Sequence, residues 1–227
     1  MPVAHRTYLD RRDAGRQLAP LLEKWKAGGP VVFALPRGGV PVAVEVARSL
    51  NLPLDLLYVR KIGAPMEPEL ALGAVVDGAD PDIVFNEPLV DRLGVSRDVL
   101  EKLTKRELKE VERRRRQYGK ATKPLMPTGR PAIIVDDGLA TGASMRAAVK
   151  ALRRRGATRV VVAVPVAPPD AVRQLEEDGA EVVCPLVVEH FAGVGAFYRD
   201  FRQLTDADVA DALASLGEAM SQHADET

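Results

Sequence analysis

Several residue types are scarce in this chain of 227 residues, and each scarcity removes a class of site. Its one cysteine, Cys184, excludes an internal disulfide framework and a multi-cysteine zinc site. The three histidines lie at positions 5, 190 and 223, without the spacing of metal ligands. Aromatic residues make up only 4% of the chain, and the formal net charge is zero. We therefore expect no general electrostatic attraction to nucleic acids or to anionic membranes.

Long apolar segments are also lacking. No run approaches the roughly 18 apolar residues of a membrane span, and the first residues do not form the apolar core of a signal peptide. The remaining composition, with 46% hydrophobic and 28% charged residues, is typical of a globular protein. We expect a cytoplasmic protein whose residues 1–227 form a single domain.

Apolar runs alternate with helical patterns along most of the chain. We expect helices over residues 10–27, 41–50, 96–118, 144–155, 168–178 and 205–216, and strands over residues 31–35, 54–59, 132–135, 159–166 and 180–188. A smaller antiparallel excursion is expected around residues 72–76 and 83–85, and a linker over residues 119–130. Alternating strands and helices predict an α/β fold, with a mostly parallel central sheet, helices on both faces and a small hood or insert.

The most informative segment covers residues 133–144 and reads I-I-V-D-D-G-L-A-T-G-A-S. An apolar strand ends in Asp136 and Asp137, and a loop of small residues leads into a helix. The hydroxyl groups of Thr141 and Ser144, together with the N–H groups of the helix terminus, suit a phosphate. The two carboxylates would repel a phosphate, so they suit hydroxyl groups or a bound cation instead. The segment therefore predicts a ligand such as a sugar phosphate.

This segment resembles the phosphoribosyl pyrophosphate (PRPP) signature of the type I phosphoribosyltransferases, with Ser144 in its final hydroxyl position. The resemblance implies that the ribose 5-phosphate is bound by Asp136, Asp137, Gly138, Leu139, Ala140, Thr141, Gly142, Ala143 and Ser144. It also implies Mg²⁺ as the cofactor, held by Asp136 and Asp137 indirectly or through PRPP. Both aspartates are candidate catalytic residues, and Asp137 is a candidate proton acceptor.

A second loop, Pro36, Arg37, Gly38 and Gly39, follows the expected strand over residues 31–35. Two glycines permit a tight turn whose amide groups can face an anion, and Arg37 adds a positive charge. The segment looks like the loop that grips pyrophosphate in type I phosphoribosyltransferases. The resemblance also implies a cis peptide bond, most readily between Pro36 and Arg37. The alternative is an ordinary helix entry with Arg37 in solvent.

Arg60 and Lys61 follow the strand expected over residues 54–59. In the family, basic residues at this place help to neutralise pyrophosphate, and the next loop closes over the site. Residues 62–70 could form this lid, within an insert over residues 62–130 that also contains a charged helix. The alternative is a pair of surface cations. The arginine run at residues 113–116 is expected to be a solvated helix face, with an RNA- or polyphosphate-facing patch as the alternative.

The acceptor that attacks PRPP is not identified by these loops. In the family it lies under a variable hood, for which the candidates are the N-terminal segment and residues 189–203, within a C-terminal region over residues 189–227. Phe191, Phe197 and Tyr198 could stack on a planar base, or they could pin this region to the core.

The resemblance implies an enzyme that transfers phosphoribosyl from PRPP to a nucleobase or a related nitrogen nucleophile. One alternative is a PRPP- or nucleotide-sensing regulator, including an RNA-binding one, and another is an interaction protein that has lost its chemistry. We expect PRPP and a small nitrogenous acceptor as ligands, no membrane partner and no nucleic acid. The oligomeric state stays open, a homodimer included.

Overall fold

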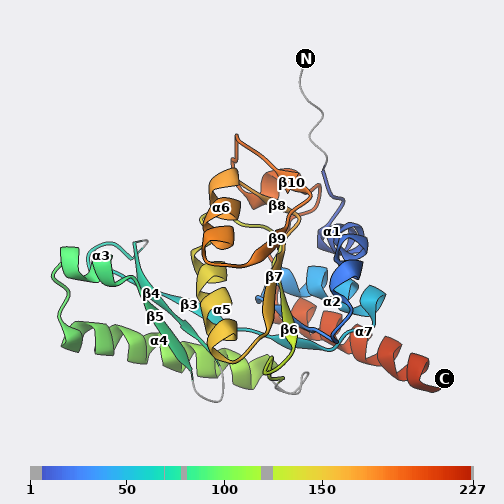
Figure 1. The fold of residues 1–227 in the computed structure, drawn as a ribbon, viewed down its shortest axis with the longest axis horizontal. Helices are drawn as coiled ribbons and strands as arrows, with labels where there is room; N and C mark the ends of the chain where they lie inside the picture. Colours follow the sequence, from blue (N-terminus) through green and yellow to red (C-terminus); the bar gives the residue numbers. More distant parts are fainter. Residues whose placement is uncertain (1–6, 69, 78–80, 119–124, 226–227) are drawn as a thin grey trace.

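The computed structural model describes residues 7–68, 70–77, 81–118 and 125–225. Its centre is a parallel sheet of five strands in the order β2-β1-β6-β7-β9 (Figure 1). The strands are β1 (Val31–Ala34), β2 (Leu54–Leu56), β6 (Pro131–Val135), β7 (Arg159–Ala163) and β9 (Glu181–Val183). The predicted α/β fold with a parallel central sheet is confirmed.

Alternate residues of the central strands enter two separate hydrophobic cores. In β1, Val32 and Ala34 face one core, whereas Val31 and Phe33 face the other. The first core is covered by α1 (Arg11–Leu18), the 3₁₀ helix η1 (Ala19–Trp25), α2 (Gly39–Leu50) and α7 (Asp206–Asp225). The second is covered by α5 (Ala143–Arg154) and α6 (Pro169–Glu177). Helices therefore cover both faces of the sheet, as predicted.

A second sheet extends to one side of the central sheet (Figure 1). Its antiparallel strands are β3 (Val59–Gly63), β4 (Ala71–Val76) and β5 (Asp82–Phe85), and they are followed by α3 (Glu87–Arg92) and α4 (Arg97–Tyr118). The expected antiparallel excursion is confirmed. The expected strand over residues 54–59 was wrong in extent, because the chain leaves the central sheet after Leu56. Arg60 and Lys61 therefore lie within a strand of the second sheet and do not follow the end of a strand.

Prolines shorten the last two predicted strands. Pro165 separates β7 from β8 (Val166–Ala167), and Pro185 separates β9 from β10 (Leu186–Val187). Proline has no N–H group to donate within a sheet, so the chain bends at both positions. The pieces β8 and β10 pair with each other in a two-stranded parallel sheet, and the short 3₁₀ helix η2 (Val194–Phe197) follows them.

A Thr-x-x-Asp cap, formed by Thr205 and Asp208, begins the terminal helix α7. The Thr205 backbone N–H donates to Asp208 Oδ2 at 2.7 Å, and the Asp208 N–H donates to Thr205 Oγ1 at 3.2 Å. The helix continues past the predicted end at residue 216. Residues 119–124 of the predicted linker, residues 1–6 of the N-terminal hood candidate and position 69 of the predicted lid lie outside the described residues. In the described ranges, no helix is both long and apolar enough to cross a bilayer.

Gly15 on α1 provides a test of how closely α1 packs on α2. A Cβ atom at this position would lie 2.6 Å from Val42 O and 2.8 Å from Glu45 Cβ. We expect Gly15→Ala to lower the free energy of unfolding by about 1–3 kcal/mol through overpacking. Gly217→Ala is the matched control, because a Cβ there meets nothing within 4 Å. In urea unfolding, the control should be neutral or stabilising; equal stability of both variants would contradict this packing.

Candidate functional site

The central sheet has its topological switch point between β1 and β6. From β1 the chain continues to β2 on one side, whereas from β6 it continues to β7 and β9 on the other. Ligands of open parallel sheets bind at such a point, beyond the carboxyl ends of the strands. The strands pair with Ala34 opposite Val135, so the loops at residues 36–39 and 136–142 leave the sheet side by side. The two loops therefore converge at one edge of the sheet.

Two glycines bring the loops into direct contact. A Cβ atom on Gly38 would overlap the carboxylate of Asp137, and one on Gly39 would lie 2.6 Å from Val135 O. Any larger side chain would push the loops apart. The peptide bond between Pro36 and Arg37 is cis, as the resemblance implied.

Asp136 and Asp137 form a partly buried carboxylate pair at the end of β6. Asp136 Oδ1 accepts a hydrogen bond of 2.8 Å from the Asp137 backbone N–H. Burial, and then the nearby Asp137 carboxylate, raise the pKa of Asp136 well above its usual value. Burial also raises the pKa of Asp137, although its ion pair with Arg11 opposes this shift. Two ionised carboxylates side by side are therefore unfavourable here, and binding a proton, a cation or hydroxyl groups stabilises the pair.

Arg11 is a site residue that no sequence pattern predicts. Its Nε atom lies 2.7 Å from Asp137 Oδ2, and its Nη1 atom donates to Arg202 O at 3.0 Å. The guanidinium carbon lies 3.8 Å from the centre of the Phe201 ring. A lone arginine on a helix gives no local signal of a partner 126 positions away.

The loop of small residues ends at an open helix terminus. Gly142 precedes α5 in the left-handed conformation, with φ of 70°, and no side chain caps the helix. Thr141, Ala143 and Ser144 are exposed there, whereas Gly138 and Leu139 are buried. The first turn of α5 thus presents backbone N–H groups and two hydroxyl groups to solvent, which suits a phosphate.

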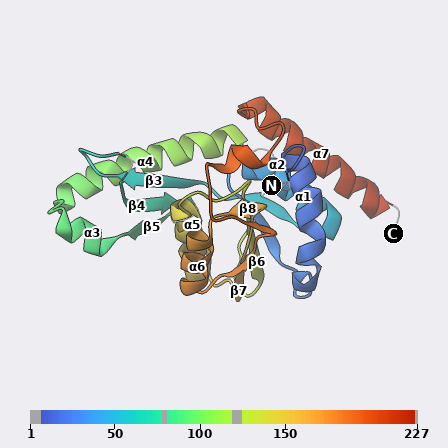
Figure 2. The ribbon, with the colours of Figure 1, turned by 90° about the horizontal axis from the view of Figure 1, so that it is seen from above.

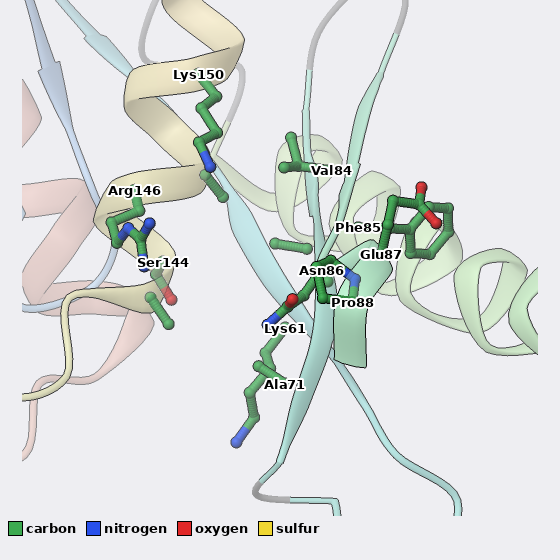
Figure 3. Close-up of a pocket in the computed structure, with 14 residues that line it drawn as sticks. Lys61, Ala71, Val84, Phe85, Asn86, Glu87, Pro88, Ser144, Arg146 and Lys150 are labelled. Carbon is green, nitrogen blue, oxygen red and sulfur yellow. The ribbon is translucent and has the colours of Figure 1, made fainter. Parts of the chain in front are cut away.

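A cavity of about 440 Å³ lies between this terminus and the second sheet (Figure 3). Ser144, Arg146 and Lys150 line one wall, and Lys61 and Asn86 line the other. Lys61 therefore shares a cavity with the expected phosphate loop.

Arg60 lies on the other face of the same strand. Its guanidinium group bonds Glu107 of α4 at 3.0 Å. The resemblance predicted that Arg60 and Lys61 bind pyrophosphate together. In the structure Arg60 bonds Glu107, whereas Lys61 lines the cavity beside Ser144. Lys61 is therefore the stronger candidate for a ligand contact.

The hood candidates lie in a segment, residues 191–202, that contacts Tyr8 and Arg11 near the other end of the chain; we call it the strap. Tyr8 pairs with Tyr198, and the Tyr8 backbone N–H donates to Phe197 O at 2.9 Å. Phe197 and Tyr198 are buried, and the Tyr198 hydroxyl group donates to Asp137 O at 2.5 Å. Phe191 stacks on Phe197 with ring centres 5.7 Å apart. This packing favours the alternative that Phe197 and Tyr198 pin the region to the core. A contact between Phe191 and the acceptor stays a prediction.

The donor atoms fit a cation that a ligand helps to hold. Carboxylate oxygens are the ligands that Mg²⁺ prefers, and Asp136 and Asp137 supply them at the strand end. Among the described residues there is no group of three or more carboxylate, histidine or cysteine side chains that could hold a metal ion. The pair alone would leave most of the coordination shell to water and substrate oxygens.

The arginine run on α4 is only in part a solvated helix face. Arg113 and Arg114 both bond Glu110, and Arg116 bonds Glu112 at 3.2 Å, as expected for neighbouring turns. Arg113 and Arg114, however, also line a cavity beside Pro36 and Arg37.

Comparisons with known proteins identify the family and the fold of this chain. The model of the phosphoribosyl transferase domain matches residues 83–202. A protein of Mycobacterium tuberculosis, provisionally named a phosphoribosyl transferase, is 44% identical to this chain over 200 residues. The matched region covers 88% of this chain and 45% of that protein. The chain thus spans about half the length of this relative. The crystal structure of TT1426 from Thermus thermophilus superimposes with a TM-score of 0.82 at 44% identity, over 92% of this chain and 99% of that one.

The Arg11–Asp137 ion pair leads to a prediction about pH. A carboxyl group whose pKa is raised on folding retains a proton in the native state that the unfolded state has lost, so its contribution to stability falls as the pH rises between the two pKa values. Arg11→Leu removes the group that opposes this shift. We expect it to cost about 3 kcal/mol of unfolding free energy above neutral pH, and less at pH 5.

Urea unfolding at pH 5 and pH 8 measures this difference. Arg16→Leu on the same helix is the control, because Arg16 is 55% exposed and lies 3.9 Å from Asp13. A loss for Arg11→Leu that does not change with pH would rule out the carboxyl pair as its cause.

Proposed function

The chain belongs to the phosphoribosyl transferase domain family, and on this basis we propose that it transfers the 5-phosphoribosyl group of PRPP to a nitrogen nucleophile. The C1–O bond to pyrophosphate breaks, a C1–N bond forms, and pyrophosphate leaves. The observation that carries this proposal is the contact of Gly38 with Asp137 at the switch point. It joins a loop suited to ribose 5-phosphate with a loop suited to pyrophosphate.

Each loop has a part in the proposed site. The residues from Gly138 to Ser144 bind the 5-phosphate with backbone N–H groups and the hydroxyl groups of Thr141 and Ser144. Asp136 and Asp137 hold the ribose hydroxyl groups, and Arg37 with the adjoining amide groups binds pyrophosphate. Mg²⁺, bound together with PRPP, would neutralise charge that develops on the leaving group.

The aspartate pair also contributes electrostatically to the reaction. The sugar becomes cationic as pyrophosphate departs, and a nearby carboxylate stabilises that charge. Burial raises the pKa of Asp136 and of Asp137, which makes each carboxylate a better proton acceptor for the nucleophile. We propose further that the lid over residues 62–70 closes over the site and excludes water, which would otherwise capture the sugar cation.

The acceptor is proposed as a nucleobase or a related amine. It must approach C1 from the side opposite pyrophosphate, next to Asp136 and Asp137. The strap around Phe191 adjoins this place through the hydrogen bond of Tyr198 to Asp137. A panel of purine and pyrimidine bases with PRPP, assayed for released pyrophosphate, would identify the acceptor; binding of PRPP without turnover on any base would favour the sensing alternative.

Binding of PRPP tests the donor directly. We expect calorimetry with PRPP and Mg²⁺ to show binding, and the double variant Asp136→Asn with Asp137→Asn to weaken it by roughly 100-fold or more, since two charge-assisted contacts are lost. Asp170→Asn, at an exposed carboxylate on α6, is the control. Wild-type protein that ignores millimolar PRPP would refute the proposed function. Circular dichroism of the double variant checks that it remains folded.

Lys61 provides a test of which end of PRPP the second sheet contacts. Because Lys61 and Ser144 line one cavity, we expect Lys61→Gln to weaken binding of ribose 5-phosphate by about tenfold and to leave binding of inorganic pyrophosphate unchanged. Lys109→Gln removes the same charge at an exposed position of α4 and serves as the control. If Lys61→Gln instead weakens only the binding of pyrophosphate, Lys61 contacts the pyrophosphate end of PRPP.

A further inference from the structure

A second cavity, of about 210 Å³, lies beside the cis peptide bond and is lined by Pro36, Arg37, Arg113, Arg114 and Asp206. We call it the arginine cleft. Three separate elements meet there: the loop after β1, the end of α4 and the start of α7. Figure 2 shows the end of α4 beside the start of α7. Three guanidinium groups therefore gather next to the loop proposed to grip pyrophosphate.

Asp206 is the counter-ion of this cleft. Its Oδ1 atom lies 3.6 Å from Arg37 Nη1, and the two side chains are 44% and 40% exposed. The pKa of Arg113 is raised by its hydrogen bond and attraction to Glu110, and also by attraction to Asp206. One carboxylate thus faces arginines from two elements, as an external anion would.

Glu110 fixes the two arginines of α4 as a pair. It accepts hydrogen bonds from Arg113 Nε at 2.8 Å and Nη2 at 2.9 Å, and from Arg114 Nε at 2.9 Å. These bonds lower the pKa of Glu110 to about 2, so it stays ionised at neutral pH. Two like charges on adjacent residues are held in place by a single carboxylate, which leaves an excess of positive charge for a further anion.

We propose that the arginine cleft is the outer half of the pyrophosphate site and that Asp206 fills it while no ligand is bound. This inference rests on the proposed function. An arriving pyrophosphate group displaces the Asp206 carboxylate from Arg37, and Arg113 and Arg114 bind its distal phosphate. The exchange is inexpensive because a half-exposed ion pair is weak, whereas a phosphate brings more charge and more oxygen atoms. Asp206 in turn competes with the product and so favours its release.

Calorimetry with inorganic pyrophosphate and Mg²⁺ tests this assignment. We expect Arg113→Gln with Arg114→Gln to weaken binding by about tenfold or more, since contacts between charged groups are lost. Asp206→Asn should strengthen it by about two- to fivefold, the range expected for release of an exposed ion pair. Arg116→Gln, which is 82% exposed on α4, and Asp211→Asn, which is exposed on α7, are the matched controls.

Ribose 5-phosphate separates this inference from the proposed function. Its binding should be equal in the wild type and in all four variants, because the arginine cleft does not contact that end of PRPP. If the wild type binds PRPP, but the double arginine variant binds pyrophosphate as Arg116→Gln does, the inference is wrong and the proposed function stands. Weaker binding of pyrophosphate to Asp206→Asn would also overturn it. If the wild type binds neither PRPP nor ribose 5-phosphate, the proposed function itself fails.

Discussion

The candidate site depends on the close approach of two backbone segments at the switch point. Parallel pairing of β1 with β6 sets the loops side by side, and the absence of side chains at Gly38 and Gly39 lets them touch. The contact brings a carboxylate pair next to amide groups and an arginine. The carboxylates bind hydroxyl groups or a cation, whereas the amide groups and the arginine bind an anion, so one crevice combines two opposite ligand preferences. A ligand with an anionic group at each end and hydroxyl groups between them matches both preferences.

Burial makes the aspartate pair costly, and the surrounding contacts offset that cost. Arg11 supplies a charge to Asp137, and the Tyr198 hydroxyl group bonds the backbone oxygen of the same residue. Both contacts come from outside the central sheet, so the elements that flank the sheet have an electrostatic role at its switch point. The raised pKa values show that compensation is incomplete, as at many functional sites.

The parts of the site that local patterns encode were predictable, and the parts that depend on tertiary contacts were not. Residues 133–144 and 36–39 were recognisable because small residues, hydroxyl groups and charges occur together at strand ends. Arg11 and Asp206 look like ordinary helix residues until their partners from distant segments are known. The helix α3 was missed because Asn86 and Pro88 resemble loop breakers, although proline is well accommodated in a first helical turn. Arg60 and Lys61 were misplaced because nothing local marks where the chain changes sheets.

The strap that supports Asp137 has a consequence for how the protein is made. Arg11 bonds the backbone of Arg202, and Tyr8 bonds that of Phe197, which are contacts between residues separated by most of the chain. During synthesis, the central strands can emerge and pair while Phe197 and Arg202, which bond Tyr8 and Arg11, are still untranslated. The carboxylate pair therefore acquires its full support only after residue 202 has left the ribosome. The crevice therefore reaches its final form late in folding, after the central sheet has formed.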